Sequence, residues 1–366
     1  MVNFVRMRLT LILLLFISCS LKAQYRLEWG LEYRQKVGYL AAHRGVMSHL
    51  PQSQALAGEL TWYVNTKGRR PWHEAAGYPV YGVTGFLGSV GNNEILGRFA
   101  GAYAFMEFPF LQLWKYRFSG KLGSGLGYTA KVFDQETNPK NTAMSTHVNA
   151  LICVGVKSEL IFRRNKITLG LDMTHFSNGA TKVPNLGVNL PYVSLGYARQ
   201  ITKTEKDSIR LHQTVPFQKW LFGVTAIGSV KEVYPTERRK YPVYAISTFA
   251  RWFSRPKVGF EAAFDVISKQ AILGYKPNIS KTQWDILQLG TYIGYLLPLD
   301  RFHFALGMGV YLKDKFQPED FMYHRIGLRY YFPNGIHSQV ILKSHWARAD
   351  YVEWGMGYTF NFKRDK

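Results

Sequence analysis

The fold of this chain is decided by the stretch Phe302-His303-Phe304-Ala305-Leu306-Gly307-Met308-Gly309-Val310-Tyr311-Leu312. Its even-numbered side chains are all apolar, whereas the odd-numbered ones are mostly small or polar. Successive side chains of an extended strand point to opposite faces. An apolar face opposite a small or polar face, over about ten residues, is typical of a strand in an outer-membrane β-barrel.

The same alternation recurs in residues 148–162 and 352–362. No window after the N-terminal segment reaches the roughly 18 consecutive apolar residues of a transmembrane helix. Turn-forming residues separate the alternating segments, with tight turns expected at 163–165, 254–256, 298–300 and 333–335. Longer loops are expected at 133–145, 178–188, 232–240, 269–282 and 313–320. We therefore predict an all-β fold, a single transmembrane antiparallel β-barrel of about 14 strands, with 12 to 16 allowed.

The first residues have the pattern of a secretory signal. Arg6 and Arg8 precede an apolar run from Leu9 to Ile17, and Leu21-Lys22-Ala23 offers a cleavage site. We predict a signal peptide over residues 1–24 and a barrel over residues 25–366, integral to the outer membrane of a bacterial cell. Cys153 is the only cysteine left after cleavage, so no disulfide framework is expected.

The composition is strongly basic. The chain has 46 Lys and Arg against 24 Asp and Glu, a net charge of +22, and loss of the signal peptide leaves 43 against 24, or +19. In an exported chain without a nucleic-acid motif, this charge indicates phosphorylated glycolipid or an anionic membrane surface as partner. The alternative is a scatter of loop and lumen charges. His73-Glu74 lacks a second histidine, and we predict no metal site and no cofactor.

One strand carries a pair of residues with catalytic potential. Ile167, Leu169, Leu171 and Met173 form an apolar face that should contact lipid, and His175 and Ser177 continue it. A histidine two residues from a serine lies on the same face of a strand, where it can act as the base for a hydroxyl nucleophile. Twelve tilted strand residues climb roughly 30 Å, so the pair should lie at the outer-leaflet interface.

The loop after this strand supplies possible partners. If the strands on either side of it pair, Asn189 lies beside His175, and its carboxamide oxygen can accept from imidazole Nδ1–H. Asp172 lies on the opposite face of the strand and is rejected for this role. Possible oxyanion and supporting groups are Asn178, Asn185 and the backbone N–H groups of Gly179 and Gly187. Lys182 is a possible contact for a substrate phosphate.

The run His175-Phe176-Ser177-Asn178, followed by Pro184-Asn185 and Gly187, resembles the signature of the outer-membrane lipid A 3-O-deacylase (PagL-type) family. The resemblance implies a small barrel that removes an ester-linked acyl chain from lipid A, with the histidine as base and the serine as nucleophile. In that family a glutamate stands twelve residues after the serine. This chain has Asn189 there, so the identity of the third residue departs from the pattern.

A second family has an asparagine at the position of Asn189, twelve residues after the serine. The calcium-dependent outer-membrane phospholipase A barrels resemble this chain in a His-x-Ser-Asn-Gly run with asparagine at the same spacing, but they carry an arginine where this chain has Ala180. Calcium is expected only under this alternative. A third possibility is a non-enzymatic pore with a relic motif, since about 14 strands leave room for a channel. Both enzyme families have fewer strands than predicted here, so the region after about residue 205 is unexplained by them.

Overall fold

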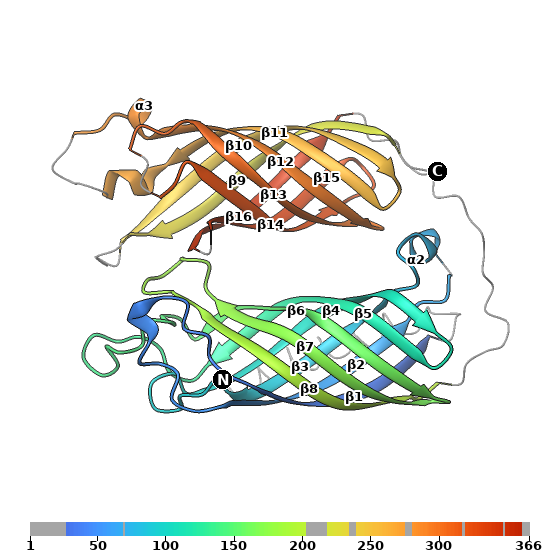
Figure 1. Cartoon of the computed structure of the whole chain (residues 1–366). Coiled ribbons are helices and arrows are strands. Elements are labelled where there is room, and N and C mark those ends of the chain that lie inside the picture. Colours follow the sequence, from blue (N-terminus) through green and yellow to red (C-terminus); the bar gives the residue numbers. More distant parts are fainter. Residues whose placement is uncertain are drawn as a thin grey trace, which may run out of the picture.

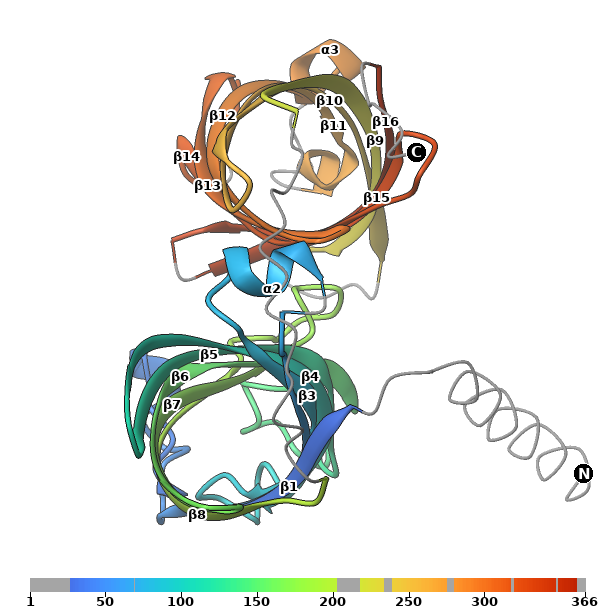
Figure 2. The same cartoon turned by 90° about the vertical axis from the view of Figure 1, so that its right-hand side faces the viewer.

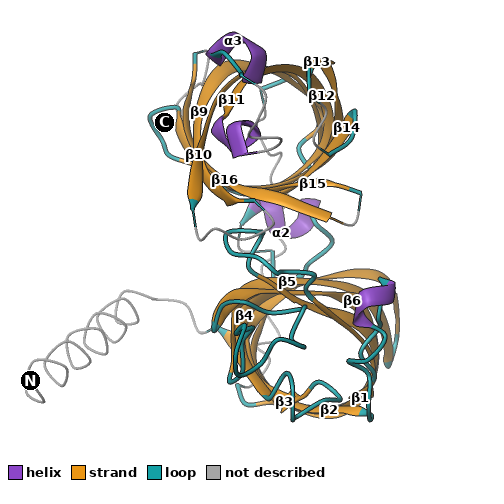
Figure 3. Ribbon diagram, turned by 90° about the vertical axis from the view of Figure 1, so that its left-hand side faces the viewer, coloured by secondary structure: helices purple, strands orange, loops and turns teal. Residues whose placement is uncertain are grey.

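The computed structural model describes residues 27–68, 70–202, 218–233, 239–274, 280–316, 319–346 and 348–360. The predicted signal peptide lies outside these ranges. Sixteen antiparallel strands form two closed barrels that lie side by side, and Figures 2 and 3 view them along their axes. No helix within the described ranges is long and apolar enough to cross a membrane.

The first barrel contains eight strands, coloured blue to green in Figure 1. They are β1 (Glu28–Gly38), β2 (Ala55–Asn65), β3 (Val80–Ser89), β4 (Arg98–Leu113), β5 (Tyr116–Thr129), β6 (Val148–Phe162), β7 (Asn165–Ser177) and β8 (Val188–Gln200). Each strand pairs with the next, and β8 pairs back with β1. A 3₁₀ helix (Gly45–Met47) lies between β1 and β2, and α2 (Pro71–Ala75) lies between β2 and β3.

The second barrel also contains eight strands. They are β9 (Trp220–Glu232), β10 (Lys240–Arg255), β11 (Val258–Lys269), β12 (Leu287–Leu299), β13 (Phe302–Lys313), β14 (Met322–Tyr331), β15 (Ile336–His345) and β16 (Arg348–Thr359). Here β16 closes the sheet by pairing with β9. A 3₁₀ helix (Gln270–Gly274) and α3 (Gln283–Ile286) lie between β11 and β12.

The prediction of a single barrel of about 14 strands is therefore wrong. The tight turns expected at 163–165, 254–256, 298–300 and 333–335 do connect neighbouring strands. The error lies in the closure, because β8 pairs with β1 instead of continuing to β9. The available signal was the connection from Gln200 to Trp220, which is far longer than the turns that join strands at the same end of the barrels.

The alternation in the sequence matches the faces of the strands. On β7, Ile167, Leu169, Leu171 and Met173 are exposed on the outside of the barrel, while Lys166 and Thr168 are buried inside it. On β13, Phe302, Leu306, Met308 and Leu312 are exposed, and Ala305 is buried. The outer surface is thus apolar and the inner surface is polar, as in barrels that cross a membrane.

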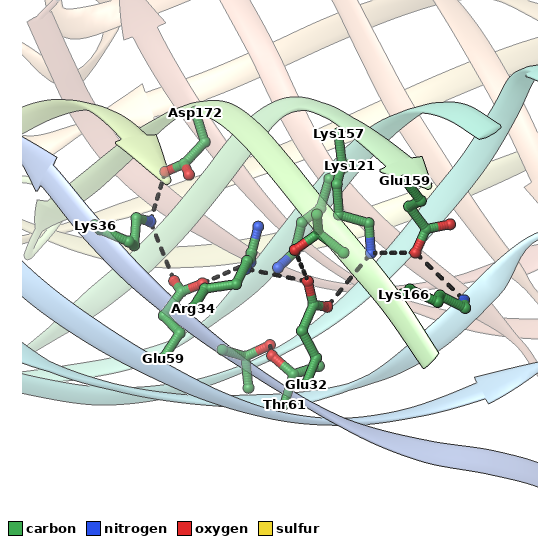
Figure 4. Close-up of polar contacts among 12 residues, drawn as sticks. Glu32, Arg34, Lys36, Glu59, Thr61, Lys121, Lys157, Glu159, Lys166 and Asp172 are labelled. Carbon is green, nitrogen blue, oxygen red and sulfur yellow. Dashed lines mark hydrogen bonds and ion pairs between the residues drawn. The ribbon is translucent and has the colours of Figure 1, made fainter. Parts of the chain in front are cut away.

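The interior of the first barrel is filled by buried ion pairs, shown in Figure 4. Lys157 Nζ lies 2.7 Å from a carboxylate oxygen of Glu107, 3.3 Å from Glu159 and 3.4 Å from Glu32. Further along the lumen, Lys36 bridges Asp172 at 2.6 Å and Glu59 at 3.1 Å, and Arg34 pairs with Glu59. Buried charges are stable only when paired. An eight-stranded barrel has room for such side chains but no room for a wide channel beside them.

The second barrel is filled in the same way. Arg329 and Arg251 both pair with Glu261, and Arg325 bridges Asp265 and Glu353. All six side chains are buried. The wide lumen on which the pore alternative depended is therefore replaced by two narrow interiors that side chains occupy.

Replacing Lys157 with methionine should destabilise the first barrel by about 3–5 kcal/mol, because three carboxylates would lose a buried partner. The measurement is the urea midpoint of the purified protein in lipid vesicles. Lys67→Met is the matched control, since Lys67 pairs with Glu28 at the partly exposed end of the barrel, where a pair contributes only about 0–1 kcal/mol. Equal midpoints for the two variants would contradict the stabilising role of the lumen network.

Candidate active site

Phe176 orients the motif by pointing into the barrel. Its side chain is fully buried, with its ring centroid 4.9 Å from that of Phe99 and 5.6 Å from that of Phe86. Gly127 on β5 leaves the space, because a Cβ there would lie 2.4 Å from the Phe176 ring. Since neighbours on a strand point to opposite faces, this anchoring turns His175 and Ser177 toward the outside.

The strand register brings Asn189 to His175. Residues 175 and 189 are direct partners in the β7–β8 pairing, and Asn189 Oδ1 lies 2.6 Å from His175 Nδ1. A carboxamide oxygen only accepts hydrogen bonds, so Nδ1 carries the proton and Nε2 keeps its lone pair. This is the tautomer in which imidazole can act as a base at Nε2. Asp172 lies inside the barrel, paired with Lys36.

Ser177 lies at the end of β7, and two donors form hydrogen bonds with its hydroxyl oxygen. Its Oγ accepts from Asn185 Nδ2 at 2.9 Å and from the backbone N–H of Gly179 at 3.2 Å. Within the described ranges no hydrogen bond joins Ser177 Oγ to His175, and such bonds often tighten only when substrate binds. Two donors that converge on the nucleophile oxygen can also reach an oxyanion on the carbon that this oxygen attacks.

Asn178 holds the loop between β7 and β8 through three hydrogen bonds. Its backbone N–H donates to Asn185 Oδ1 at 3.1 Å, which leaves Asn185 Nδ2 directed at Ser177. Its own Nδ2 donates to Ser145 Oγ at 3.0 Å and to the Lys182 carbonyl at 2.9 Å. The side-chain amide of Asn178 is thus engaged within the loops, whereas that of Asn185 faces the serine. The Lys182 side chain is exposed.

Gly187 provides space for the histidine. Its φ is +76°, and a Cβ there would lie 2.9 Å from His175 Cε1. Its backbone N–H donates to the Ala143 carbonyl at 3.1 Å, so this group is not directed at Ser177. Of the two backbone donors considered from the sequence, the structure directs only that of Gly179 at the serine.

Two residues that the sequence motif did not indicate also contact the site. His43, between β1 and β2, has its Nδ1 3.1 Å from Asn189 Nδ2. Glu232, at the end of β9 in the second barrel, accepts from the backbone N–H of Val183 at 2.9 Å. Both contacts join segments far apart in the sequence, and no spacing rule relates them to His175 and Ser177.

The second barrel therefore touches the loop between β7 and β8. In addition to the Glu232 contact, Gly179 packs so closely on the second barrel that a Cβ there would lie 2.5 Å from Val352 Cγ2. Gly179 has a φ of +64° and is the residue whose N–H donates to Ser177. Figure 1 shows this loop between the two barrels.

One group of possible metal ligands occurs among the described residues, in the second barrel. Donor atoms of Glu319, His345 and Asp350 lie within 4.8 Å of one another. Lys269 Nζ lies 2.7 Å from Glu319 and 2.9 Å from Asp350, and Lys231 pairs with the same two carboxylates. A cation would have to displace two ammonium groups, so this group is an ion-pair cluster.

Two family models match the chain, one for each barrel. Residues 56–198 match "Lipid A 3-O-deacylase (PagL)", and residues 219–362 match "Acyloxyacyl hydrolase, C-terminal domain". The first match contains His175, Ser177 and Asn189.

No curated protein matches. Among solved structures, a mutant of the Rh. blastica porin is 8% identical over 92% of this chain and 100% of the porin, with a TM-score of 0.19. The siderophore receptor PirA from Pseudomonas aeruginosa is 8% identical over 90% of this chain and 80% of the receptor, with a TM-score of 0.21.

Gly187→Ala should slow the reaction of Ser177 with a fluorophosphonate probe by about 10²-fold, because the added methyl group displaces His175. Gly85→Ala is the control, since a Cβ there would lie 3.9 Å from its nearest neighbour, the Leu60 carbonyl oxygen. Thermal unfolding of both variants separates displacement from misfolding. A Gly187→Ala protein that labels as fast as wild type would show that His175 does not activate the serine.

Glu232→Ala should slow the same labelling by about tenfold, since the Val183 N–H would lose a charged acceptor that holds the loop. Glu232→Gln keeps an acceptor oxygen at this position and should retain most of the rate. Identical rates in the alanine variant and the wild type would mean that the second barrel does not order the loop.

Proposed function

Because this chain belongs to the lipid A 3-O-deacylase (PagL) family, with an acyloxyacyl hydrolase C-terminal domain as its second barrel, we propose that Ser177, His175 and Asn189 remove an ester-linked acyl chain from lipid A. Family membership makes the chain a carboxylic ester hydrolase. The observation that supports these three residues is the 2.6 Å contact between Asn189 Oδ1 and His175 Nδ1, on the strand that ends at Ser177.

The first half of the proposed reaction forms an acyl-enzyme. Ser177 Oγ attacks the ester carbonyl carbon while His175 Nε2 takes the hydroxyl proton. The carbonyl oxygen becomes an oxyanion that Asn185 Nδ2 and the Gly179 N–H stabilise. The carbon–oxygen bond to the sugar then breaks, and the protonated His175 gives its proton to the departing sugar oxygen.

The second half regenerates the enzyme. A water molecule attacks the carbonyl carbon of the acyl-serine as His175 Nε2 takes a proton from it. The bond to Ser177 Oγ breaks, the serine recovers its proton from His175, and a free fatty acid leaves. The products are one fatty acid and a lipid A molecule with one ester fewer.

Asn189 performs only part of the role of an acid in this position. Its oxygen holds His175 in the tautomer with a free Nε2, as a carboxylate would. It carries no charge to stabilise the imidazolium that forms in both halves of the reaction. The two donors on Ser177 therefore carry more of the transition-state stabilisation in this chain.

The placement of the motif supports a substrate in a membrane. His175 continues the outward face of β7, whose four apolar residues from Ile167 to Met173 are exposed. We propose that this surface contacts the outer leaflet of a bacterial outer membrane, where the ester bonds of lipid A lie. Lys182, exposed on the adjoining loop, is proposed to contact a lipid A phosphate.

Ser177→Ala and His175→Ala should each lower acyl release from lipopolysaccharide by at least about 10³-fold, and the double variant should be no slower than either. Mass spectrometry of the products of the purified protein in detergent measures the release. Ser124→Ala, at an exposed serine on the outside of β5, is the control and should retain full activity.

Phospholipid vesicles, with and without calcium, separate the two enzyme classes that the motif resembles. Cleavage of lipopolysaccharide without calcium supports the proposal. Calcium-dependent cleavage of phospholipid alone would replace it with a phospholipase. Acyl release that persists in Ser177→Ala would refute the serine mechanism.

A further inference from the structure

We propose that His43 is a positioning residue, which orients the side-chain amide of Asn189 and thereby sets the tautomer of His175. The inference rests on the proposed function, in which His175 is the base. His43 belongs to the segment between β1 and β2 and lies outside the motif on β7 and the loop that follows it.

The side-chain amide of Asn189 can adopt two orientations that differ in what they offer His175, whereas a carboxylate offers an acceptor in both. Both oxygens of a carboxylate accept hydrogen bonds, so either one can hold the Nδ1–H of a histidine. A carboxamide has one acceptor and one donor, and rotation by about 180° exchanges them. In the rotated form Nδ2 would donate to His175 Nδ1, the ring proton would move to Nε2, and the base would be lost.

His43 distinguishes the two orientations. With Asn189 Oδ1 on His175 Nδ1 at 2.6 Å, Asn189 Nδ2 faces His43 Nδ1 at 3.1 Å. A neutral imidazole nitrogen without a proton accepts this hydrogen bond. In the rotated form that nitrogen would face Oδ1, and with the His43 proton on Nε2 two acceptors would meet and the bond would be lost. The contact with His43 thus stabilises the orientation in which His175 is a base.

The backbone holds His43 in place. The N–H of Ala41 donates to the Asn189 carbonyl at 2.9 Å, which extends the pairing of β1 with β8 beyond the end of β1. Leu40 beside it is buried in the core of the barrel. The segment that carries His43 is therefore attached to the residue whose side chain it orients.

The tautomer of His175 can be read without substrate. Nitrogen NMR of the full-length protein, labelled with ¹⁵N-histidine and held in detergent, reports which ring nitrogen carries the proton, and loss of a signal in His175→Gln assigns it. Wild type should show the proton on Nδ1. His43→Lys offers only donors to Asn189, so it should rotate the amide and move the proton to Nε2. An unchanged tautomer in His43→Lys would overturn the proposal.

Two variants separate orientation from simple loss of structure. His43→Glu offers only acceptor oxygens to Asn189 and should keep the wild-type tautomer. In Asn189→Asp both side-chain oxygens accept hydrogen bonds, so the tautomer of His175 should no longer depend on residue 43. The double variant Asn189→Asp/His43→Lys should therefore keep the proton on His175 Nδ1. If His43→Lys moved the proton equally in both backgrounds, the amide would not be the route of the effect.

Hydrolysis of lipopolysaccharide gives the second measurement. His43→Lys should slow acyl release by about 10²- to 10⁴-fold, the scale of a catalytic histidine held in the wrong tautomer, and His43→Ala should be slowed less. In the Asn189→Asp background the same substitution should change the rate less than about threefold. Equal losses in the two backgrounds would count against the proposal.

His49→Lys is the matched control, since His49 lies in the same segment and contacts the Lys140 carbonyl through Nε2, to which a lysine can also donate. It should match wild type in tautomer and rate. A wild-type protein that releases no acyl chain would remove the proposed function, while the NMR result would still decide the orientation of Asn189.

Discussion

The structure depends on one constraint: a strand with an apolar outer face must satisfy its backbone hydrogen bonds within its own sheet, so the sheet has to close. In this chain the closure occurs twice, between β8 and β1 and between β16 and β9. Eight strands enclose a narrow interior, which buried ion pairs fill in both barrels. The basic composition suggested an anionic partner, but some of the basic residues instead form ion pairs with acidic residues inside the two barrels.

Closure of the first barrel also positions the residues of the candidate active site. The β7–β8 register sets Asn189 opposite His175, and the β1–β8 pairing brings the segment with His43 to the other side of the same asparagine. Phe176 fills the interior and turns its two neighbours outward. The site therefore lies on the outside of the barrel, with its polar partners drawn from three strands and the loops that extend them.

The second barrel gives the site a support that a single small barrel would lack. Glu232 and Val352 contact the loop that carries the two donors to Ser177. Its interior is as full as that of the first barrel. Its closest connection with the proposed reaction is this contact with the loop between β7 and β8.

The sequence by itself determined the all-β class, the inner and outer faces of the strands that it indicated, and the tight turns, because these follow from two-residue periodicity and turn-forming residues. It also predicted that residues 175 and 189 face each other if their strands pair. It also indicated the chemistry, since the motif spans only 15 residues from His175 to Asn189. Only the tertiary structure decided that there are two barrels, that Asn178 and Gly187 support the loop, that His43 reaches Asn189 and that Glu232 reaches the loop. These are pairings between distant segments, and the local pattern of a strand is the same whichever neighbour closes its sheet.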